Sequence, residues 1–223
     1  MKNLQNITLC IIDCKNYENA AKSIIHCSKF SNINFAKSIY FSDIKHFKLK
    51  DHNIDFIKID KIKSAREYDN FIIKSFYQYI DTEFVLIVQH DGLIYKPENW
   101  NDNFLKFDYI GACWPTAPKK QNKVGNGGFS LRSKRFMQEA SKVLNNNYCN
   151  EAEDVYLCET LYDYMKDNNF KYATVDIASN FSSELEWSKT NYDSFGFHLA
   201  ACNPIQVHKE YRDKIYENIH KNW

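Results

Sequence analysis

Glycine and proline are scarce in this sequence and confined to its later part. The 223-residue chain has only 6 glycines and 4 prolines, and all of them lie between Gly92 and Pro204. A P-loop or a dinucleotide-binding fingerprint places glycines directly after an early strand, so that backbone amides can cradle phosphate. Here the first candidate strand, Ile7–Ile12, runs into Asp13–Asn16 without a glycine. Both devices are therefore excluded in the N-terminal half, and a nucleotide would have to bind there by another route.

The chain also lacks an excess of charge of either sign. It carries 29 basic and 28 acidic side chains, which gives a formal net charge of +1. A protein that neutralises many phosphates of a nucleic acid or an acidic membrane needs a basic excess. Lysines are spread along the chain, and the small group of Lys119, Lys120 and Lys123 is typical of a solvated loop. We therefore expect no nucleic-acid partner.

Closely spaced cysteine pairs and long apolar runs are absent as well. The seven cysteines include no CxxC pair, so they do not form a zinc-binding pattern, and we expect reduced, mostly buried thiols. The longest wholly apolar run, Phe84–Val88, is far shorter than the ~20 residues of a membrane span. Asp13 interrupts the first apolar stretch, which argues against a signal peptide. The sequence predicts a soluble, cytoplasmic protein without a transmembrane segment.

The N-terminal half shows the pattern of an α/β layer. Ser64 and Glu67 form a capping box at a helix start, and Phe84–Val88 is typical of a strand covered on both faces. The expected order is strand Ile7–Ile12, a helix from Tyr17, strand Ala36–Phe41, strand Ile54–Ile59, a helix from Ser64 and strand Phe84–Val88. This order predicts an α/β fold with a mostly parallel central sheet flanked by helices.

The second half of the chain is less regular. Its expected elements are a short strand at Phe107–Gly111, a glycine-rich turn at Val124–Leu131 that enters another strand, helices at Ser133–Leu144 and Glu153–Lys166, a strand at Phe170–Val175 and a final helix at Val207–Ile219. The total length suits one compact domain, or one domain with a small appendage.

Polar residues follow the candidate parallel strands, where such sheets bind ligands. Gln89-His90-Asp91-Gly92 closes the central strand, and alternation would place Gln89 and Asp91 on one face and His90 on the other. One carboxylate beside a glutamine suits a hard cation whose other ligands are phosphate oxygens and water. The alternative is an Asp-Gly turn that simply ends a strand, with His90 as a hydrogen-bonded core residue.

A glycine-rich segment follows at Val124–Leu131. Gly125, Gly127 and Gly128 leave a backbone that can approach a ligand closely or adopt positive φ. A plain hairpin needs only Asn126-Gly127, so the extra glycines favour a substrate floor, with the hairpin as the alternative.

Two further motifs lie later in the chain. The acidic run Glu151-Ala152-Glu153-Asp154 opens a helix, where carboxylates either complement the helix dipole or project as a general base. In Phe195-Gly196-Phe197-His198, aromatic residues and a glycine frame a histidine that could stack, donate, bind a metal or serve the core.

Five segments of the sequence together resemble one known family. They are Leu86–Gly92, Phe107–Pro115, Val124–Ser133, Glu153–Tyr156 and Phe195–His198, of which the middle one is the most specific. The family comprises glycosyltransferases of GT-A type, is catalogued as a domain of unknown function, and occurs in capsule and polysaccharide loci. The resemblance covers roughly residues 7–200 of the chain.

The resemblance implies a GT-A-like, Rossmann-related single domain over residues 1–223. Residues 1–92 would form the nucleotide-binding half, and residues 93–223 would form the acceptor- and sugar-binding half with a C-terminal helix. The partners would be a nucleotide-sugar donor and a glycan-type acceptor.

The resemblance also implies a divalent cation, Mn²⁺ or Mg²⁺, that holds the donor diphosphate. The Asp-x-Asp motif of the superfamily maps onto Gln89-His90-Asp91, where Gln89 replaces the first carboxylate. Asp91 would therefore be the main acidic ligand, and His198 matches the position of a late histidine ligand.

Catalytic and binding roles follow from the same resemblance. Asp154, with Glu153 as second choice, would accept the proton of the acceptor hydroxyl in an inverting enzyme, which adds about 10²–10⁴ in rate. In a retaining enzyme Asp154 would instead hold donor-sugar hydroxyls. The other candidate substrate contacts are Asp13 and Ser42-Asp43 beside base and ribose, Arg66 toward the nucleotide or diphosphate, Gln89, Asn126, Gly127 and Gly128 along the cleft, and Trp114 and Trp187 as stacking faces.

Three functional hypotheses remain open at this level. The first is a metal-assisted glycosyltransferase. The second is a sugar- or nucleotide-binding module of the same fold with lapsed catalysis, which the glutamine at position 89 favours. The third is a metal-dependent phosphoesterase, which would require more clustered Asp and His residues than the sequence offers.

Overall fold

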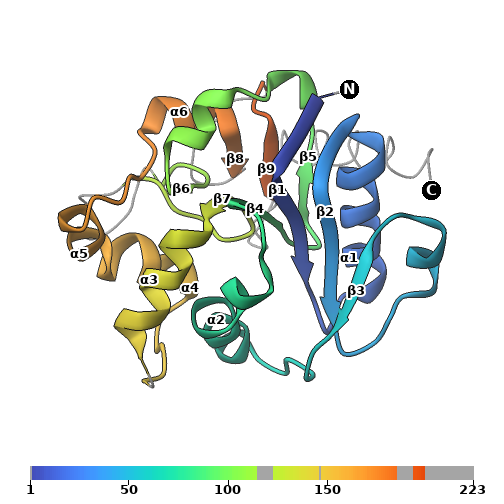
Figure 1. Cartoon of the computed structure of the whole chain (residues 1–223), viewed down its shortest axis with the longest axis horizontal. Helices are drawn as coiled ribbons and strands as arrows, with labels where there is room; N and C mark the ends of the chain where they lie inside the picture. The colour runs from blue at the N-terminus through green and yellow to red at the C-terminus, as the bar shows by residue number, and fades with distance from the viewer. Residues whose placement is uncertain (1, 115–122, 146, 185–192, 199–223) are drawn as a thin grey trace, which may run out of the picture.

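The computed structural model describes residues 2–114, 123–145, 147–184 and 193–198. The strands are β1 (Lys2–Ile12), β2 (Ile33–Ser42), β3 (Asp55–Lys58), β4 (Phe84–Val88), β5 (Gly92–Ile94), β6 (Tyr109–Ile110), β7 (Phe129–Ser133), β8 (Ser182–Glu184) and β9 (Gly196–His198). The α-helices are α1 (Tyr17–Ile25), α2 (Ala65–Lys74), α3 (Lys134–Leu144), α4 (Glu153–Val155), α5 (Tyr162–Asp167) and α6 (Val175–Phe181). Figure 1 shows their arrangement.

The main sheet has six strands in the order β3-β2-β1-β4-β7-β6. β1 pairs in parallel with both β2 and β4, and β2 pairs in parallel with β3. β7 runs against both of its neighbours, β4 and β6. The prediction of an α/β fold with a mostly parallel sheet is confirmed, and the order of elements up to β4 is the expected one.

The sheet is covered on both faces, as the apolar run of β4 predicts. Alternate residues of β4 belong to two different cores, and the exposed fraction of each of its five residues is 4% or less. One core lies against α1 and the strands β5 and β9, and the other against α2 and α3. The carboxyl ends of β1, β2 and β3 lie in the lower part of Figure 1.

A second sheet of three strands, β5-β9-β8, lies beside the end of β4. Its register pairs His198 with Gly92 on one side and with Glu184 on the other. Asp91 immediately precedes Gly92 in the chain. This short sheet therefore brings three distant segments of the sequence to one point.

Two sequence-based predictions of secondary structure in the second half need correction: a helix is present but interrupted, and a strand is wrong. The expected helix Glu153–Lys166 is split into α4, a π-helical turn at Tyr156–Thr160 and α5, because the amide of Leu161 bonds to the carbonyl of Tyr156 and shifts the helical register. The expected strand Phe170–Val175 makes only one bridge, from Tyr172 to the two-residue strand β6, and Val175 already begins α6. The predicted helix Val207–Ile219 lies outside the described residues.

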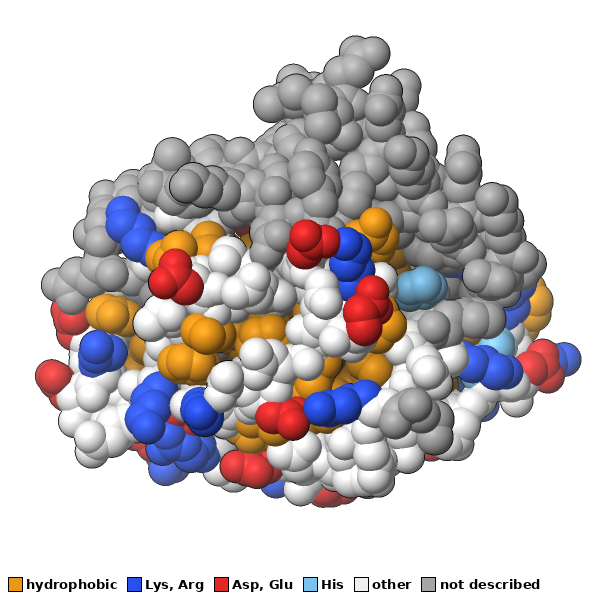
Figure 2. Space-filling model, turned by 90° about the horizontal axis from the view of Figure 1, so that it is seen from above, with side chains coloured by type: hydrophobic (Ala, Val, Ile, Leu, Met, Phe, Trp, Pro, Cys, Tyr) orange, Lys and Arg blue, Asp and Glu red, His pale blue; other side chains and the backbone are white. Residues whose placement is uncertain are grey.

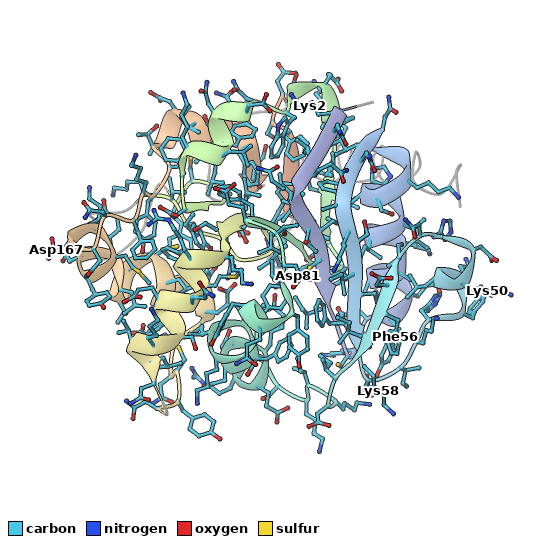
Figure 3. The ribbon with its side chains drawn as sticks, in the orientation of Figure 1. Lys2, Lys50, Phe56, Lys58, Asp81 and Asp167 are labelled. Carbon is cyan, nitrogen blue, oxygen red and sulfur yellow. The ribbon has the colours of Figure 1, made fainter. Side chains whose placement is uncertain are left out.

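The distribution of charged side chains on the described surface agrees with the net charge of +1. Figure 3 marks Lys2 and Lys58 at opposite ends of the sheet, and Figure 2 looks onto the end that carries Lys2. Basic and acidic side chains are interspersed on that face. None of the helices in the described ranges is long and apolar enough to cross a membrane. The cysteines at positions 10, 14, 27, 113, 149 and 158 are buried, as expected.

Candidate active site

The candidate site is built on the turn that follows β4. The amide of Gly92 donates to the carbonyl of Gln89 (3.0 Å) and closes this turn. The Gln89 amide donates to the carbonyl of Gly128 (2.8 Å), and the Ser23 hydroxyl of α1 donates to the carbonyl of Gly92 (2.6 Å). The turn is thus fixed between the glycine-rich segment on one side and α1 on the other.

The side chains of this turn do not follow the alternation expected from the sequence. Gln89 donates from Nε2 to the Tyr68 hydroxyl (3.2 Å) on α2, whereas Asp91 lies 3.9 Å from His90. The chain leaves the strand after Val88, so the two-residue period no longer holds. His90 is not a core residue either, because about a third of its side chain is exposed (33%).

His198 joins Asp91 and Glu184 in one buried cluster. His198 Nε2 lies 3.3 Å from Asp91 Oδ1, and His198 Nδ1 lies 3.6 Å from Glu184 Oε1. Burial alone would lower the pKa of His198, but the Asp91 and Glu184 carboxylates outweigh it and raise the pKa to about 10. Burial acts to raise the pKa of Asp91, and the His198 imidazole outweighs that and lowers it.

Sequence reasoning paired Asp91 with His198 but missed Glu184. The segment Ser182-Ser183-Glu184 matches no motif, and only the parallel pairing of β8 with β9 places its carboxylate beside His198. No local sequence signal could have identified it.

The residues of this cluster fit a divalent cation that is completed by ligand oxygens. No group of three or more His, Cys, Asp or Glu side chains within the described residues is arranged to hold a metal alone. Asp91 Oδ1 is nevertheless buried and accepts no hydrogen bond from the residues described, with His198 Nε2 3.3 Å away. One carboxylate oxygen and one imidazole nitrogen at this separation suit an ion whose other ligands come from a diphosphate and water, and the ion would have to displace the proton that His198 holds at its pKa of about 10.

Asp13 lies beside the cluster at the end of β1. Its Oδ1 accepts the amides of Lys15 (2.7 Å) and Asn16 (2.5 Å), and its Oδ2 lies 3.4 Å from His90 Nδ1. Burial acts to raise the pKa of Asp13, but these partners outweigh it and lower the pKa. The hydrogen bond to Asp13 in turn raises the pKa of His90.

Asp43, at the end of β2, accepts a hydrogen bond from the Tyr17 hydroxyl (3.0 Å) and lies 4.0 Å from Lys61 Nζ. The acidic residues expected at the ends of β1 and β2 therefore lie at the same edge of the sheet as Asp91, because these strands and β4 are parallel.

The glycine-rich segment forms a close-packed loop over this cluster. Asn126, at φ 67°, takes the left-handed conformation, and none of the described glycines has a positive φ. Its Oδ1 accepts the amide of Gly128 (2.8 Å), and its Nδ2 lies 3.0 Å from His198 Nδ1. The glycines allow the loop backbone to pack closely against neighbouring side chains. A Cβ on Gly128 would lie 2.2 Å from the His198 ring, and one on Gly127 would lie 1.7 Å from Glu153 Oε1.

The two carboxylates that open α4 have different surroundings. Glu153 is buried and forms a two-pronged ion pair with Arg132 (2.7 and 2.8 Å), whereas Asp154 is only partly buried. Asp154 Oδ2 accepts the Gly127 amide (3.2 Å), and its Oδ1 accepts the Val155 amide (2.9 Å). Burial and the negative charge of Glu153 raise the pKa of Asp154 to about 7.

Arg66 holds the segment that leads into α4. Its guanidinium donates to the carbonyls of Cys149 (3.2 Å) and Glu151 (3.1 Å), and Asn70, one turn further along α2, bonds to the backbone of Cys149. Trp114 packs its ring against Gly125, where a Cβ would lie 2.2 Å from the indole. Trp187 lies outside the described residues.

Residues 51–198 match a protein family described as "Protein of unknown function (DUF5672)". The chain belongs to this family. The DUF5672 match ends at His198, so it contains β4, the glycine-rich loop, α4 and β9, and with them every residue of the candidate site except those that follow β1 and β2. No curated protein matches the chain.

Solved structures with the same fold include glycosyltransferases. One is involved in the glycosylation of the major capsid of PBCV-1; it has a TM-score of 0.55 at 14% sequence identity, over 95% of this chain and 98% of that one. An active-site mutant of LgtC aligns with a TM-score of 0.52 at 14% identity, over 96% of this chain and 95% of that one. The galactosyltransferase LgtC in complex with donor and acceptor sugar analogs aligns with a TM-score of 0.53 at 13% identity, over the same shares. This DUF5672 chain therefore has the fold of GT-A glycosyltransferases.

Proposed function

We propose that the protein is a glycosyltransferase that transfers a sugar from a nucleotide-sugar donor to a hydroxyl of a glycan or a similar acceptor. One observation carries the proposal: in a fold shared with glycosyltransferases, Asp91, His198 and Asp154 converge on the Asn126–Gly128 loop at the carboxyl edge of the parallel sheet. This edge is where open α/β sheets bind ligands.

The proposed cofactor is a divalent cation, Mn²⁺ or Mg²⁺, held by Asp91 and His198. When bound, it would neutralise charge on the nucleoside diphosphate that leaves the sugar. The acidic surroundings support the proposal, because Asp13, Asp91 and Glu184 would otherwise repel a diphosphate. Gln89 donates its side-chain amide to Tyr68 and adds no carboxylate to this site.

The proposed domain is a single unit whose residues 1–92 bind the nucleotide and whose residues 93–223 bind sugar and acceptor. Asp13 and Asp43, which follow β1 and β2, would meet base and ribose, and Arg66, which holds the Cys149–Glu151 segment, would approach the nucleotide or diphosphate. Because the carboxylate of Asp13 already accepts two backbone amides and contacts His90, it would contribute mainly a fixed local charge.

Asp154 is the proposed general base. A carboxyl group with a pKa near 7 is ionised in about half of the molecules at neutral pH and is a stronger base than an ordinary carboxylate. Glu153 is unsuited to this role because Arg132 binds both of its oxygens. The backbone of Asn126, Gly127 and Gly128 would form the floor beneath the sugar, with Trp114 at its edge.

The resemblance to a family from capsule and polysaccharide loci suggests a role in polysaccharide biosynthesis in the cytoplasm. The alternative is a nucleotide- or sugar-binding module without catalysis. The observation in its favour is Gln89, whose side chain supplies no second carboxylate to the cation site.

Calorimetric titration of UDP, GDP and their sugars, with and without Mn²⁺, tests the proposal. We expect one nucleotide to bind at least ten times more tightly with Mn²⁺, and Asp91→Ala to abolish this enhancement. Asp163→Ala, which removes an exposed aspartate of α5, is the matched control and should bind as the parent does. Binding that Asp91→Ala leaves unchanged would contradict the cation assignment, and binding without turnover of any nucleotide sugar would favour the module.

A further inference from the structure

A fully buried arginine lies beneath the glycine-rich loop. Arg132 on β7 has an exposed fraction of 0%, and its partner Glu153 on α4 is 4% exposed. The two guanidinium nitrogens bond to the two carboxylate oxygens at 2.7 and 2.8 Å, the parallel geometry that suits this pair best. Neither charge reaches solvent, so the pair acts entirely within the protein.

The sequence of β7 directs the arginine to this position. Phe129 and Leu131 face the core that contains α1, so alternation turns Ser130 and Arg132 toward the other face. There Arg132 Nε donates to the Ser130 hydroxyl (3.0 Å), and the guanidinium lies 5.0 Å from the ring centre of Tyr109 on the neighbouring strand. The contacts with Ser130 and Tyr109 fix the orientation of the Arg132 guanidinium.

Glu153 is fixed from a second direction by α2. Its backbone amide donates to Asp69 Oδ1 (3.0 Å), while its side chain is bound to Arg132. The start of α4 is thus tied to α2 by its main chain and to the central sheet by its side chain. Because Asp154 is the next residue, the two contacts of Glu153 also fix the backbone position of Asp154.

The loop rests directly on this ion pair. The Cα of Gly127 approaches Glu153 so closely that an added Cβ would lie 1.7 Å from Oε1 and 3.2 Å from the guanidinium of Arg132. The same Gly127 donates its amide to Asp154 Oδ2. The Glu153 carboxylate therefore limits how closely the Asn126–Gly128 loop can approach α4. The loop in turn orients the carboxylate of Asp154 through the Gly127 amide.

We propose that the Arg132–Glu153 ion pair fixes the positions of Gly127 and Asp154, so that the Asp154 carboxylate is correctly oriented to accept the proton of the acceptor hydroxyl. This inference rests on the proposed function. Arg132 and Glu153 are positioning residues, since both side chains are buried, with exposed fractions of 0% and 4%. A buried ion pair often contributes no more stability than apolar residues of similar size, so a contribution to stability does not explain why a charged pair is present here. Its contacts with Gly127 and its link to Asp154 do explain it.

The pair also tunes Asp154 electrostatically. The charged groups that face Asp154 are Glu153 on its own helix, Arg132 on β7 and Glu184 on β8. Removal of the Glu153 charge leaves Arg132 uncompensated and lowers the pKa of Asp154. A rate that depends on ionised Asp154 should then reach half its maximum at a lower pH in Glu153→Gln, measured where circular dichroism shows this variant to be folded, which a merely structural role would not cause.

The test compares the double variant Arg132→Met/Glu153→Leu with the parent and with Arg135→Met. The double variant removes both charges together, because loss of one partner alone leaves an unpaired buried charge and endangers folding. Arg135 on α3 is a suitable control because its ion pair is with Asp108 and not with Glu153. Hydrogen exchange at the Gly127 amide and turnover of UDP- and GDP-sugars with Mn²⁺ are the readouts.

We expect the double variant to bind UDP or GDP with Mn²⁺ within about twofold of the parent, to exchange Gly127 at least tenfold faster, and to lose about 100-fold in kcat. Unchanged exchange at Gly127, or kcat within threefold of the parent, would overturn the proposal. If the parent turns over no nucleotide sugar, the proposed function fails, and the exchange measurement still decides whether the ion pair holds the loop.

Discussion

Replacement of Asp154 by asparagine should stabilise the protein at neutral and alkaline pH. Asp154 is partly buried beside Glu153, and together these effects raise its pKa to about 7 from an ordinary 3.8. Asparagine has nearly the same shape and retains an oxygen that can accept the Gly127 or the Val155 amide. It removes the charge that the folded state has to accommodate above pH 7.

The direction and the size of the effect follow from proton linkage. Between pH 4 and pH 7 the folded protein keeps the proton of Asp154, whereas the unfolded chain has released it. The folded state therefore binds more protons, and the contribution of Asp154 to stability falls as the pH rises through this window. The full difference corresponds to up to about 4 kcal/mol, of which about 3 kcal/mol is lost between pH 5 and pH 8.

Urea unfolding of the parent and Asp154→Asn from pH 5 to pH 8 measures this difference, with Asp163→Asn as the control for removal of an exposed carboxylate. We expect the stability advantage of Asp154→Asn to grow by about 3 kcal/mol across the range, and that of the control to change by less than about 0.5 kcal/mol. A difference between parent and Asp154→Asn that stays constant with pH would refute the reasoning.

Three further predictions concern the same region. The kcat/KM of the parent should rise with pH on a limb centred near pH 7, and Asp154→Asn should lose that limb together with at least about 100-fold in rate, which a pH profile of nucleotide release would reveal. Gly127→Ala should cost ~2–3 kcal/mol of unfolding free energy, because its Cβ would overlap a carboxylate that Arg132 holds in place; equal stability of parent and variant in urea would contradict this. Arg66→Ala should cost about 1–2 kcal/mol and accelerate hydrogen exchange in the Cys149–Glu151 segment, whereas unaltered exchange there would mean that the Arg66 contacts do not hold it.

The N-terminal half could be predicted because its local signals agree with its tertiary environment. Ser64 caps α2 by accepting the amide of Glu67, and the Glu67 side chain reaches back to the amide of Lys63, close to the capping box read from the sequence. The apolar run of β4 is buried on both faces, as a central parallel strand requires. In these elements, propensity and packing favour the same structure.

The local geometry of the site could not be predicted, because contacts distant in sequence determine it. Gln89 points to Tyr68 on α2, and Glu184 reaches His198 only through the pairing of two three-residue strands. Asn126 takes the left-handed conformation because its side chain caps the amides of Gly128 and Phe129 and contacts His198. Residue types at the site were visible in the sequence, but apart from the Asp91–His198 pair, which the family resemblance implied, their partners were not.

The different surroundings of Glu153 and Asp154 are also determined by contacts that are distant in sequence. Both carboxylates open one helix, and the sequence ranks Asp154 before Glu153 as the proton acceptor without showing how their surroundings differ. Arg132 on a strand distinguishes them, because it binds both oxygens of the first and leaves the second facing the loop. Burial and tertiary pairing, rather than helix position, decide which one is available for proton transfer.

A crystal structure of the protein with Mn²⁺ and the nucleoside diphosphate that binds in calorimetry tests the central claim most directly. The account predicts a cation bound by Asp91 and His198 and by diphosphate oxygens, with the nucleoside lying toward Asp13 and Asp43. A nucleotide bound elsewhere, or a cation held without Asp91 and His198, would contradict it.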